Sequence, residues 1–256
     1  MAVNYNPKIV RNKLSLCLDA ANPKSYSGSG STWSDISGNG NHATLTGNSS
    51  NVTYNSAGYF THNPGNTYFG ATSSSTSASS NSDGGYWAIT DDFTLRGEDG
   101  SWTIGGWAKP NGDQSGNGGG WFHKAGGVGG DERCIMAEFI DGNFRVNGQS
   151  GWSAINHNVD NSGVWQYITV TYKTNGIYGS DGGTLKLYID GSLEATVTGF
   201  YPSTHASNAQ VWLGKRQGHN QHFFKGDLAV YHFYQRELSA SEVLQNFEAL
   251  RGRFGV

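Results

Sequence analysis

The segments WQYITVTY (residues 165–172) and LKLYIDG (residues 185–191) decide the fold class of this chain. In the first, apolar residues alternate with threonines from Ile168 onward, and in the second Leu and Ile occupy every second position. Residues two apart in a strand share a face, so both segments are typical of half-buried strands. The Asp-Gly pair at residues 190–191 is a strong two-residue hairpin signal, and a further strand is expected at residues 194–198.

Similar short segments follow one another along most of the chain, separated by Gly-, Asn- and Asp-rich turns. Strands are expected at residues 14–20, 86–95, 101–108, 121–124, 132–140, 144–147 and 211–213. Short strands flank a turn at residues 38–41. Residues 228–234 are apolar on both faces, which predicts a strand covered on both sides. Together these segments predict an all-β jelly roll, a β-sandwich of two antiparallel sheets.

One helix is expected, at the C-terminal end of the chain. Ser239 and Glu242 have capping-box spacing, in which the Ser hydroxyl accepts from a helical N–H and the Glu side chain reaches back. Apolar residues follow at helical spacing, and Arg251-Gly252 suits a C-terminal end. We therefore predict a helix at residues 239–251.

The chain is expected to form one domain. No repeat, helical linker or change of composition divides its 256 residues, and 38 glycines with 13% aromatic residues suit strands joined by turns. Residues 1–13 lack alternation and are interpreted as an N-terminal arm, so the domain occupies residues 14–256. The arm is expected to pack on its own domain or on a neighbouring chain. Residues 72–82, rich in Ser, Thr, Ala and Asn, are interpreted as a polar surface loop.

Charge and hydropathy argue against two classes of partner. The net charge is -3 and the 17 Lys and Arg residues form no dense run, so no nucleic-acid partner is expected. No apolar run approaches about 18 residues, so membrane insertion is not expected. The N-terminus lacks the apolar stretch of a signal peptide, which predicts synthesis in a cytoplasm without a cleaved signal.

The two cysteines, Cys17 and Cys134, both lie in apolar, strand-like segments. Two cysteines make no disulfide framework in a chain of this length. We interpret them as buried free thiols, with a single bridge between them as the alternative.

Five motifs in fixed order resemble the concanavalin A-like, laminin-G-like domains. They are LCLDAANPKSY (16–26) with WSDISGNGN (33–41), WTIGGWAKP (102–110), WQYITVTY (165–172), LYIDG (187–191), and GDLAVY (226–231) with RELSASE (236–242). The resemblance covers about residues 14–252 and implies a concanavalin A-like jelly roll. The opening and closing motifs look most like those in virion proteins of large tailed phages. By analogy, the resemblance implies a location in the virion and capsid or tail proteins as partners, with a homo-oligomer left open.

Some relatives of this fold are glycoside hydrolases that carry Glu-x-Asp-x-x-Glu on one strand. A retaining mechanism needs two carboxylates about 5–5.5 Å apart, and residues i and i+2 share a strand face. No two acidic residues of this chain have that spacing, and the nearest cluster, Asp131, Glu132 and Glu138, does not fit. A non-enzymatic protein is therefore expected. A divergent glycoside hydrolase, with one carboxylate from each of two strands, is the least favoured alternative.

Sugar binding needs exposed aromatic faces beside polar groups. Trp121 and Trp152 adjoin Gly- and Ser-rich loops, with His123 nearby, and these three residues are the candidates for glycan binding. Packing in the core or anchoring of a loop is the alternative for each tryptophan.

Many lectin relatives hold Ca²⁺ at a loop rim through oxygen ligands. Asp91, Asp92 and Asp99 cluster near strand starts and are candidate calcium ligands. Capping of a turn by Asp91-Asp92 is the alternative. His219 and His222 are interpreted as surface or hydrogen-bonding residues.

These observations predict a non-enzymatic virion structural or decoration protein whose lectin-like jelly roll docks on capsid or tail proteins, with host-surface glycans as further partners. A carbohydrate-binding lectin or adhesin module is the alternative function.

Overall fold

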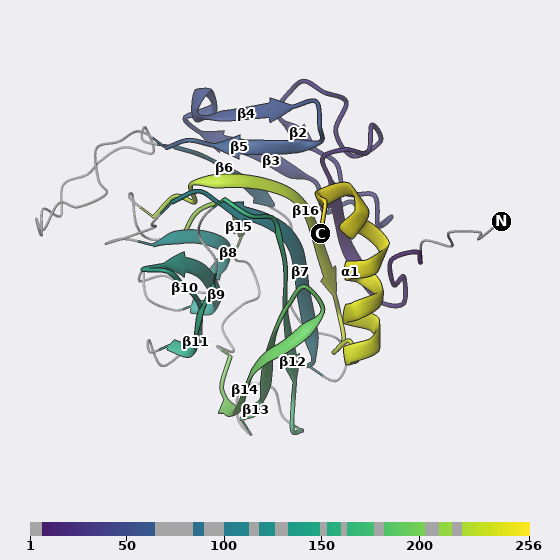
Figure 1. The fold of residues 1–256 in the computed structure, drawn as a ribbon, viewed down its shortest axis with the longest axis vertical. Helices are drawn as coiled ribbons and strands as arrows, with labels where there is room; N and C mark the ends of the chain where they lie inside the picture. The colour runs from purple at the N-terminus through teal and green to yellow at the C-terminus, as the bar shows by residue number, and fades with distance from the viewer. Residues whose placement is uncertain are drawn as a thin grey trace, which may run out of the picture.

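Two antiparallel sheets of eight strands each pack face to face (Figure 1). The computed structural model of the protein describes residues 7–64, 84–89, 100–112, 118–125, 133–148, 153–159, 163–176, 182–202, 210–216 and 222–256. The fold is the predicted all-β, concanavalin A-like jelly-roll sandwich with a single C-terminal helix in the described part of the chain.

Sheet A has β7 and β16 at its centre. Its strands run in the order β14 (Ser192–Phe200), β13 (Gly183–Ile189), β12 (Gln166–Lys173), β7 (Trp102–Pro110), β16 (Gly226–Tyr234), β5 (Tyr59–His62) and β4 (Val52–Asn55), and β1 (Leu14–Asp19) also pairs with β16. The predicted β13–β14 hairpin is present, with Ile189 opposite Ser192. Asp190 and Gly191 have φ of 49° and 81°, the left-handed backbone that a tight hairpin turn requires.

Sheet B forms the second layer of the sandwich. Its strands run in the order β11 (Ser153–Asn158), β10 (Asn143–Asn147), β9 (Arg133–Ile140), β8 (Gly119–Ala125), β15 (Val211–Leu213), β6 (Gly85–Ile89), β3 (Ala43–Gly47) and β2 (Thr32–Trp33). A short 3-10 helix, η1 (Ser49–Asn51), connects β3 to β4. The strands of β4, β5 and β11 were not predicted, because their short polar segments carry little hydrophobic alternation.

Large aromatic side chains fill the space between the sheets. Trp33, Trp87, Trp102 and Trp121 are at most 1% exposed and belong to one hydrophobic cluster with residues from both sheets. The rings of Trp33 on sheet B and Phe60 on sheet A form a T-shaped pair with centroids 4.8 Å apart. Such aromatic pairs add stabilisation beyond the burial of apolar area, so they fix the spacing of the two sheets.

All nine residues of β16 are buried, which confirms the predicted two-sided coverage. One face of the strand, including Tyr231 and Phe233, joins the core between the sheets. The other face, including Ala229 and Val230, joins a cluster under the C-terminal helix. The helix therefore explains why this strand is apolar on both faces.

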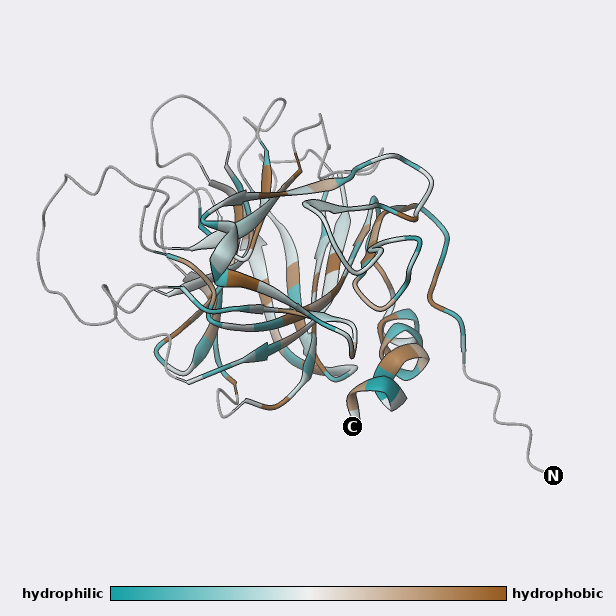
Figure 2. Ribbon diagram, turned by 90° about the horizontal axis from the view of Figure 1, so that it is seen from above, coloured by the Kyte–Doolittle hydropathy of each residue, from teal (hydrophilic) through white to brown (hydrophobic). Residues whose placement is uncertain are grey.

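The helix α1 (Ala240–Phe254) lies outside the sandwich against sheet A (Figure 2). The predicted capping box is present, since Ser239 accepts from the Glu242 N–H and the Glu242 side chain accepts from the Ser239 N–H. The predicted end at residue 251 is wrong. The helix continues to Phe254, whose ring stacks on Trp107 at 4.0 Å, and Gly255 provides the left-handed C-cap. No helix in the described residues is long and apolar enough to cross a membrane.

The described part of the N-terminal arm, residues 7–13, packs on its own domain. The Val10 N–H donates to Asn246 Oδ1 at 2.8 Å, and the Tyr234 hydroxyl donates to the Val10 carbonyl at 3.0 Å. Asn246 in turn donates to the Tyr234 hydroxyl at 3.0 Å. This closed, buried network attaches the arm to both α1 and β16.

The segment SDISGNGN (34–41) has a structural role. Buried Asp35 accepts hydrogen bonds from the N–H groups of Cys17, Ser37 and Asn41 and from the Ser37 hydroxyl, at 2.8–3.0 Å. Asn41 donates from its side chain to the Ser15 carbonyl at 2.7 Å. These bonds fasten the loop to β1, so this part of the family motif maintains the fold.

Cys17 is a buried free thiol, as predicted. Burial, together with the nearby charges of Asp19 and Asp35, raises the pKa of the Cys17 thiol to about 12. Such a thiol is chemically inert under ordinary conditions. The side chain of Cys134 lies outside the described residues.

Candidate functional site

The strands of sheet B send a second set of side chains away from the sandwich core. On β6, β8, β9 and β10 the core receives Trp87, Phe122, Ala137 and Val146, so their neighbours along each strand point the opposite way. We call this surface the polar face. It is formed by Tyr86, His123, Met136, Glu138, Arg145, Asn147 and Trp212.

The register of the strands arranges these residues in rows. Trp212 lies opposite His123, His123 opposite Met136, and Met136 opposite Asn147. In a neighbouring row, Arg145 lies directly opposite Glu138. Adjacent strands lie about 4.8 Å apart, so the row from Trp212 to Asn147 spans about 14 Å. Residues from four strands thus lie side by side on one face of sheet B, where His123, Met136 and Asn147 are at most 2% exposed.

A buried carboxylate lies at the centre of this surface. Glu138 is 1% exposed, and its carboxylate oxygens lie 4.0 Å from Arg145 Nη1 and 4.0 Å from Arg216 Nη1. Burying a charge is costly unless opposite charges accompany it. The two guanidinium groups therefore offset the burial of Glu138, and at 4.0 Å they do so through charge and not through close hydrogen bonds.

Two polar atoms on β10 are buried without a hydrogen-bond partner among the described residues. They are Asn147 Oδ1, on a side chain 2% exposed, and Arg145 Nε. Arg145 and Asn147 are two residues apart on the same strand face. An unsatisfied buried polar atom costs about 1–3 kcal/mol, and such atoms in native proteins call for an explanation. A bound ligand would satisfy both atoms if it offered a donor to Asn147 Oδ1 and an acceptor to Arg145 Nε.

Aromatic rings lie at the other end of the row. The partly exposed ring of Trp212 packs on Tyr86 with centroids 4.5 Å apart, and its Nε1 donates to Gln210 Oε1 at 2.9 Å. Lys215 Nζ lies 4.5–5.1 Å from the rings of Phe223, Tyr86 and Trp212. These contacts fix the orientation of the Trp212 ring.

The expectation that Trp121 exposes its ring is wrong. The side chain is 0% exposed and contacts Tyr231 and Phe144 in the core, at centroid distances of 5.3 and 5.6 Å. A register shift between Gly120 and Phe122 explains the difference. At this β-bulge two consecutive residues, Trp121 and Phe122, both face the core.

His123 lies on the polar face between Trp212 and Met136, and it is 2% exposed. Trp121, which was predicted to share a site with it, faces the opposite side of the sheet, and glycan binding by His123 stays a prediction. Trp152 and the candidate calcium ligands Asp91, Asp92 and Asp99 lie outside the described residues. Within the described residues, no three His, Cys, Asp or Glu side chains are grouped closely enough to hold a metal ion.

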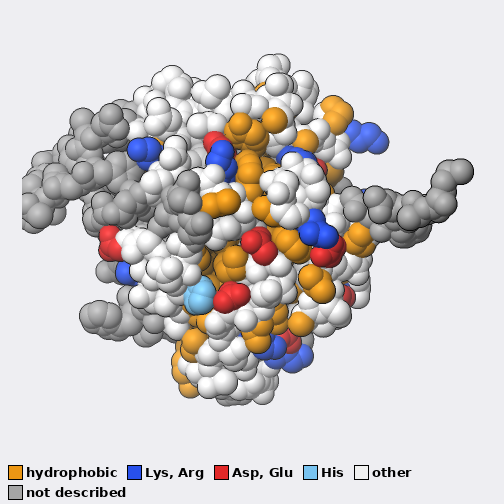
Figure 3. Space-filling view, viewed as in Figure 1, with side chains coloured by type: hydrophobic (Ala, Val, Ile, Leu, Met, Phe, Trp, Pro, Cys, Tyr) orange, Lys and Arg blue, Asp and Glu red, His pale blue; other side chains and the backbone are white. Residues whose placement is uncertain are grey.

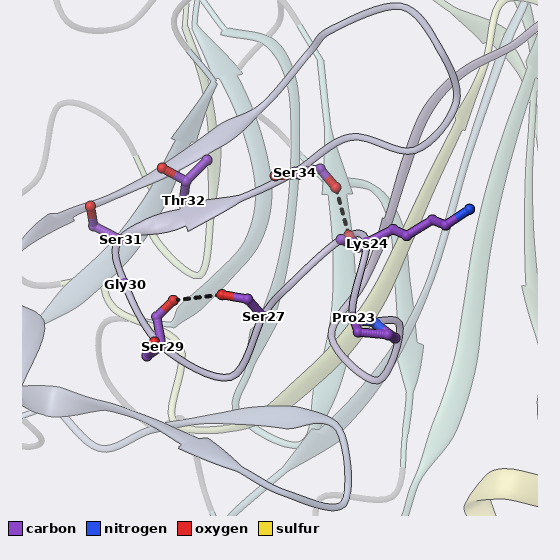
Figure 4. A pocket seen from close by; sticks show the side chains of 9 residues that line it. Pro23, Lys24, Ser27, Ser29, Gly30, Ser31, Thr32 and Ser34 are labelled. Carbon is purple, nitrogen blue, oxygen red and sulfur yellow. Dashed lines mark hydrogen bonds between the residues drawn. The ribbon is translucent and has the colours of Figure 1, made fainter.

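A pocket lies beside β2, among residues 23–34 (Figure 4). It has a volume of about 350 Å³ and is lined by Pro23, Lys24, Ser25, Ser27, Ser29, Gly30, Ser31, Thr32 and Ser34. Its walls are held by the Ser25 hydroxyl, which donates to the Ser34 carbonyl at 2.6 Å, and by the Ser27 hydroxyl, which donates to the Ser29 carbonyl at 3.2 Å. The lining offers hydroxyl groups but no aromatic ring.

The residues that complete the polar face were not predicted as site residues. Trp212 lies in a three-residue strand, and Arg145 and Asn147 follow an ordinary hairpin turn. Alternation with Val146 and Leu213, which face the core, is the signal that places them on the outer face.

The fold and the arrangement of the sheets define a lectin-like jelly-roll domain. Residues 81–244 match the Laminin_G_3 family of the concanavalin A-like lectin/glucanases superfamily. The match covers more than half of the chain, and the protein belongs to this family. No curated protein gives a significant match to the chain.

Solved structures with the same fold match at low sequence identity. Domain 4 of AbnA, an extracellular GH43 arabinanase from Geobacillus stearothermophilus solved in complex with arabinotriose, is 18% identical, with 91% of this chain and 98% of that domain covered and a TM-score of 0.60. The receptor-binding domain of botulinum neurotoxin type G is 17% identical, with 93% and 51% covered and a TM-score of 0.58. The Trypanosoma rangeli sialidase is 12% identical, with 94% and 33% covered and a TM-score of 0.61.

The chain thus spans about half of the neurotoxin domain and a third of the sialidase, but nearly all of the arabinanase domain. At these identities the matches show a shared fold. They leave the ligand of this chain to be argued from its own residues.

Proposed function

We propose that this protein is a non-catalytic glycan-binding module and that the polar face is its binding site. A sugar ring presents an apolar face that stacks on an aromatic ring, and hydroxyl groups that both donate and accept hydrogen bonds. The polar face offers both kinds of partner: the fixed, partly exposed ring of Trp212, and the buried polar atoms of Arg145 and Asn147. The unpartnered Asn147 Oδ1 is the observation that carries the proposal, because a ligand hydroxyl would satisfy it.

The polar face supports this role better than the pocket at residues 23–34. The pocket is lined by hydroxyl groups and one lysine, and it lacks a ring on which a sugar stacks. Its wall residues Ser25 and Ser27 already donate to backbone carbonyls. The polar face, in contrast, combines a stacking ring with hydrogen-bonding capacity that the described chain does not use.

The composition of sheet B supports a role without catalysis. Its eight strands contain one acidic residue, Glu138. Two arginines flank this carboxylate. Glycoside hydrolysis by the usual mechanism requires a second carboxyl group within about 5–10 Å of the first. A divergent hydrolase would therefore need its second carboxylate from outside these strands.

The arabinanase domain supports the choice of ligand class. It is a separate domain of a glycan-degrading enzyme, it was solved with arabinotriose, and this chain covers nearly its full length. By analogy, the jelly roll of this chain works as a module that holds a glycan while another component acts on the bound surface.

The setting that we propose for the module is a phage virion, as a structural or decoration protein attached to capsid or tail proteins. The support is the resemblance of the opening and closing motifs, at residues 16–41 and 226–242, to virion domains. Antibody detection of this chain in purified particles, at a fixed copy number, is the expected result. Its absence from intact particles would contradict this setting while leaving glycan binding unaffected.

Glycan binding is tested on an array, with Ca²⁺ and with EDTA. We expect signals for a restricted set of glycans, reduced at least about tenfold by Trp212→Ala and Asn147→Ala. Leu244→Ala, which changes a 45% exposed residue on α1, is the matched control and should bind as the parent protein does. An array without signal in both conditions would contradict the proposal, and so would equal binding by all three variants.

A further inference from the structure

The charges of the polar face point to one class of glycan. We infer that the polar face takes an acidic glycan and that Arg145 binds a carboxylate or sulfate group on one of its sugar rings. This inference rests on the proposed function, since it names the ligand class of the same site. It adds a charge requirement that sugar binding alone does not impose.

The described polar face and its rim carry more positive than negative side chains. Arg145 and Arg216 flank Glu138, and Lys215 lies beside Trp212. The described polar face and its rim therefore carry three cationic groups and one carboxylate, on a chain whose net charge is -3. On the side of the molecule seen in Figure 3, in contrast, acidic and basic side chains are interspersed. A local excess of positive charge attracts anionic ligands.

Arg145 retains the donors that an anionic group needs. Its Nη1 lies 4.0 Å from Glu138 Oε1, which is beyond hydrogen-bonding distance, and its Nε has no partner among the described residues. The side chain as a whole is 28% exposed, while its Nε is buried. A guanidinium is a planar fork of donors that matches carboxylate and sulfate oxygens, and such charge-assisted pairs are about twice as strong as neutral hydrogen bonds.

Glu138 orients the Arg145 side chain without accepting a hydrogen bond from it at 4.0 Å. The two residues are directly opposite in the register of β9 and β10, and Glu138 is almost fully buried. The buried carboxylate draws the guanidinium toward the sheet and leaves its outer donors for a ligand. Glu138 is therefore a positioning residue in this proposal.

Asn147 gives the bound sugar an orientation. It is two residues from Arg145 on the same face, a separation of about 7 Å along the strand. A sugar whose acidic group binds Arg145 can direct a hydroxyl group toward Asn147 Oδ1. One acidic sugar residue would then satisfy both unpartnered atoms of β10.

The test compares matched glycans that differ in charge. Oligogalacturonate is titrated against its methyl ester, and a sulfated dextran oligosaccharide against the unsulfated one, so that the two arms separate carboxylate from sulfate. We expect the parent protein to bind at least one acidic form about tenfold or more tightly than its neutral counterpart. The preference for the acidic form should weaken as the salt concentration is raised, because the Arg145 side chain is partly exposed and its interaction with an anionic group is screened.

Three variants assign this preference to Arg145. Arg145→Gln should abolish the difference between acidic and neutral forms, and Arg145→Lys should retain part of it because it keeps the charge but loses the planar fork. Arg251→Gln on α1 is the control and should leave the difference unchanged. Thermal unfolding of each variant shows whether it is folded.

The outcomes separate this inference from the proposed function. Equal binding of acidic and neutral forms, or a full preference retained in Arg145→Gln, would overturn the inference and leave glycan binding standing. If no glycan of either kind binds, the proposed function itself fails.

Discussion

Two histidines buried in sheet A make the stability of the protein depend on pH. His62 and His232 are each 2% exposed, and burial lowers the pKa of both imidazoles from 6.5 to about 4. His62 Nδ1 lies 3.2 Å from the Gly85 carbonyl, and His232 Nδ1 lies 3.4 Å from the Tyr167 hydroxyl. Both rings are therefore held neutral in the folded protein at pH 7.

Acidification should destabilise the fold with a predictable sign and size. The unfolded chain takes up protons near pH 6.5, whereas the folded chain does so only near pH 4. The two neutral histidines therefore leave the free energy of unfolding at its full value well above pH 6.5. That free energy decreases as the pH falls from 6.5 toward 4. Between pH 7 and pH 5 the decrease is about 2 kcal/mol for each histidine, or about 4 kcal/mol for both.

Urea unfolding at pH 7, 6 and 5 measures this decrease. Glu242 contributes little in this range, because Arg236 lowers its pKa to about 2 in the folded protein and its ordinary pKa of 4.5 also lies below pH 5. Burial raises the pKa of the Asp190 carboxyl group, which opposes the decrease and does not add to it. The double variant His62→Gln, His232→Gln should lose most of the decrease, although its stability at pH 7 falls. A free energy of unfolding that is constant from pH 7 to pH 5 in the parent protein would refute the reasoning.

Three further predictions concern the helix and the buried thiol. Ser239→Ala removes the N-cap hydroxyl and should lower the free energy of unfolding by about 1 kcal/mol in chemical denaturation, with no change expected if the capping box is unimportant. Phe254→Ala removes the ring stacked on Trp107 and should cost about 2 kcal/mol or more, with a red shift in tryptophan fluorescence; an unchanged spectrum and melting temperature would count against this contact. In a Cys134→Ser background, Cys17 should react with a thiol reagent at pH 8 only after unfolding, because burial raises its pKa to about 12; rapid reaction of the folded protein would contradict the burial.

The elements that local signals specify could be predicted from the sequence. The β13–β14 hairpin follows from alternation and the Asp190-Gly191 turn, and the start of α1 follows from the Ser239 capping box. The end of α1 could not be predicted from Gly252, because packing of Phe254 on Trp107 prolongs the helix. Tertiary contacts here outweigh the local propensity of a glycine.

The candidate site depends on features that a single segment does not contain. Trp121 has the sequence context of an exposed ring, yet a β-bulge turns it into the core. The row of Trp212, His123 and Asn147 exists only through the pairing of the consecutive strands β8, β9 and β10 with β15, which is distant from them in the sequence. The register between these strands is set by the whole sandwich. The residue types could therefore be found in the sequence, but their proximity in the folded protein could not be predicted from it.

The central claim is that a glycan binds on the polar face, and mapping of the binding surface tests it most directly. Backbone amide NMR shifts of the parent protein are recorded during titration with the strongest array ligand. We expect the largest shifts on β10, at residues 143–147, and on residues 211–216, which include β15. Shifts confined to the pocket at residues 23–34 or to α1 would contradict it.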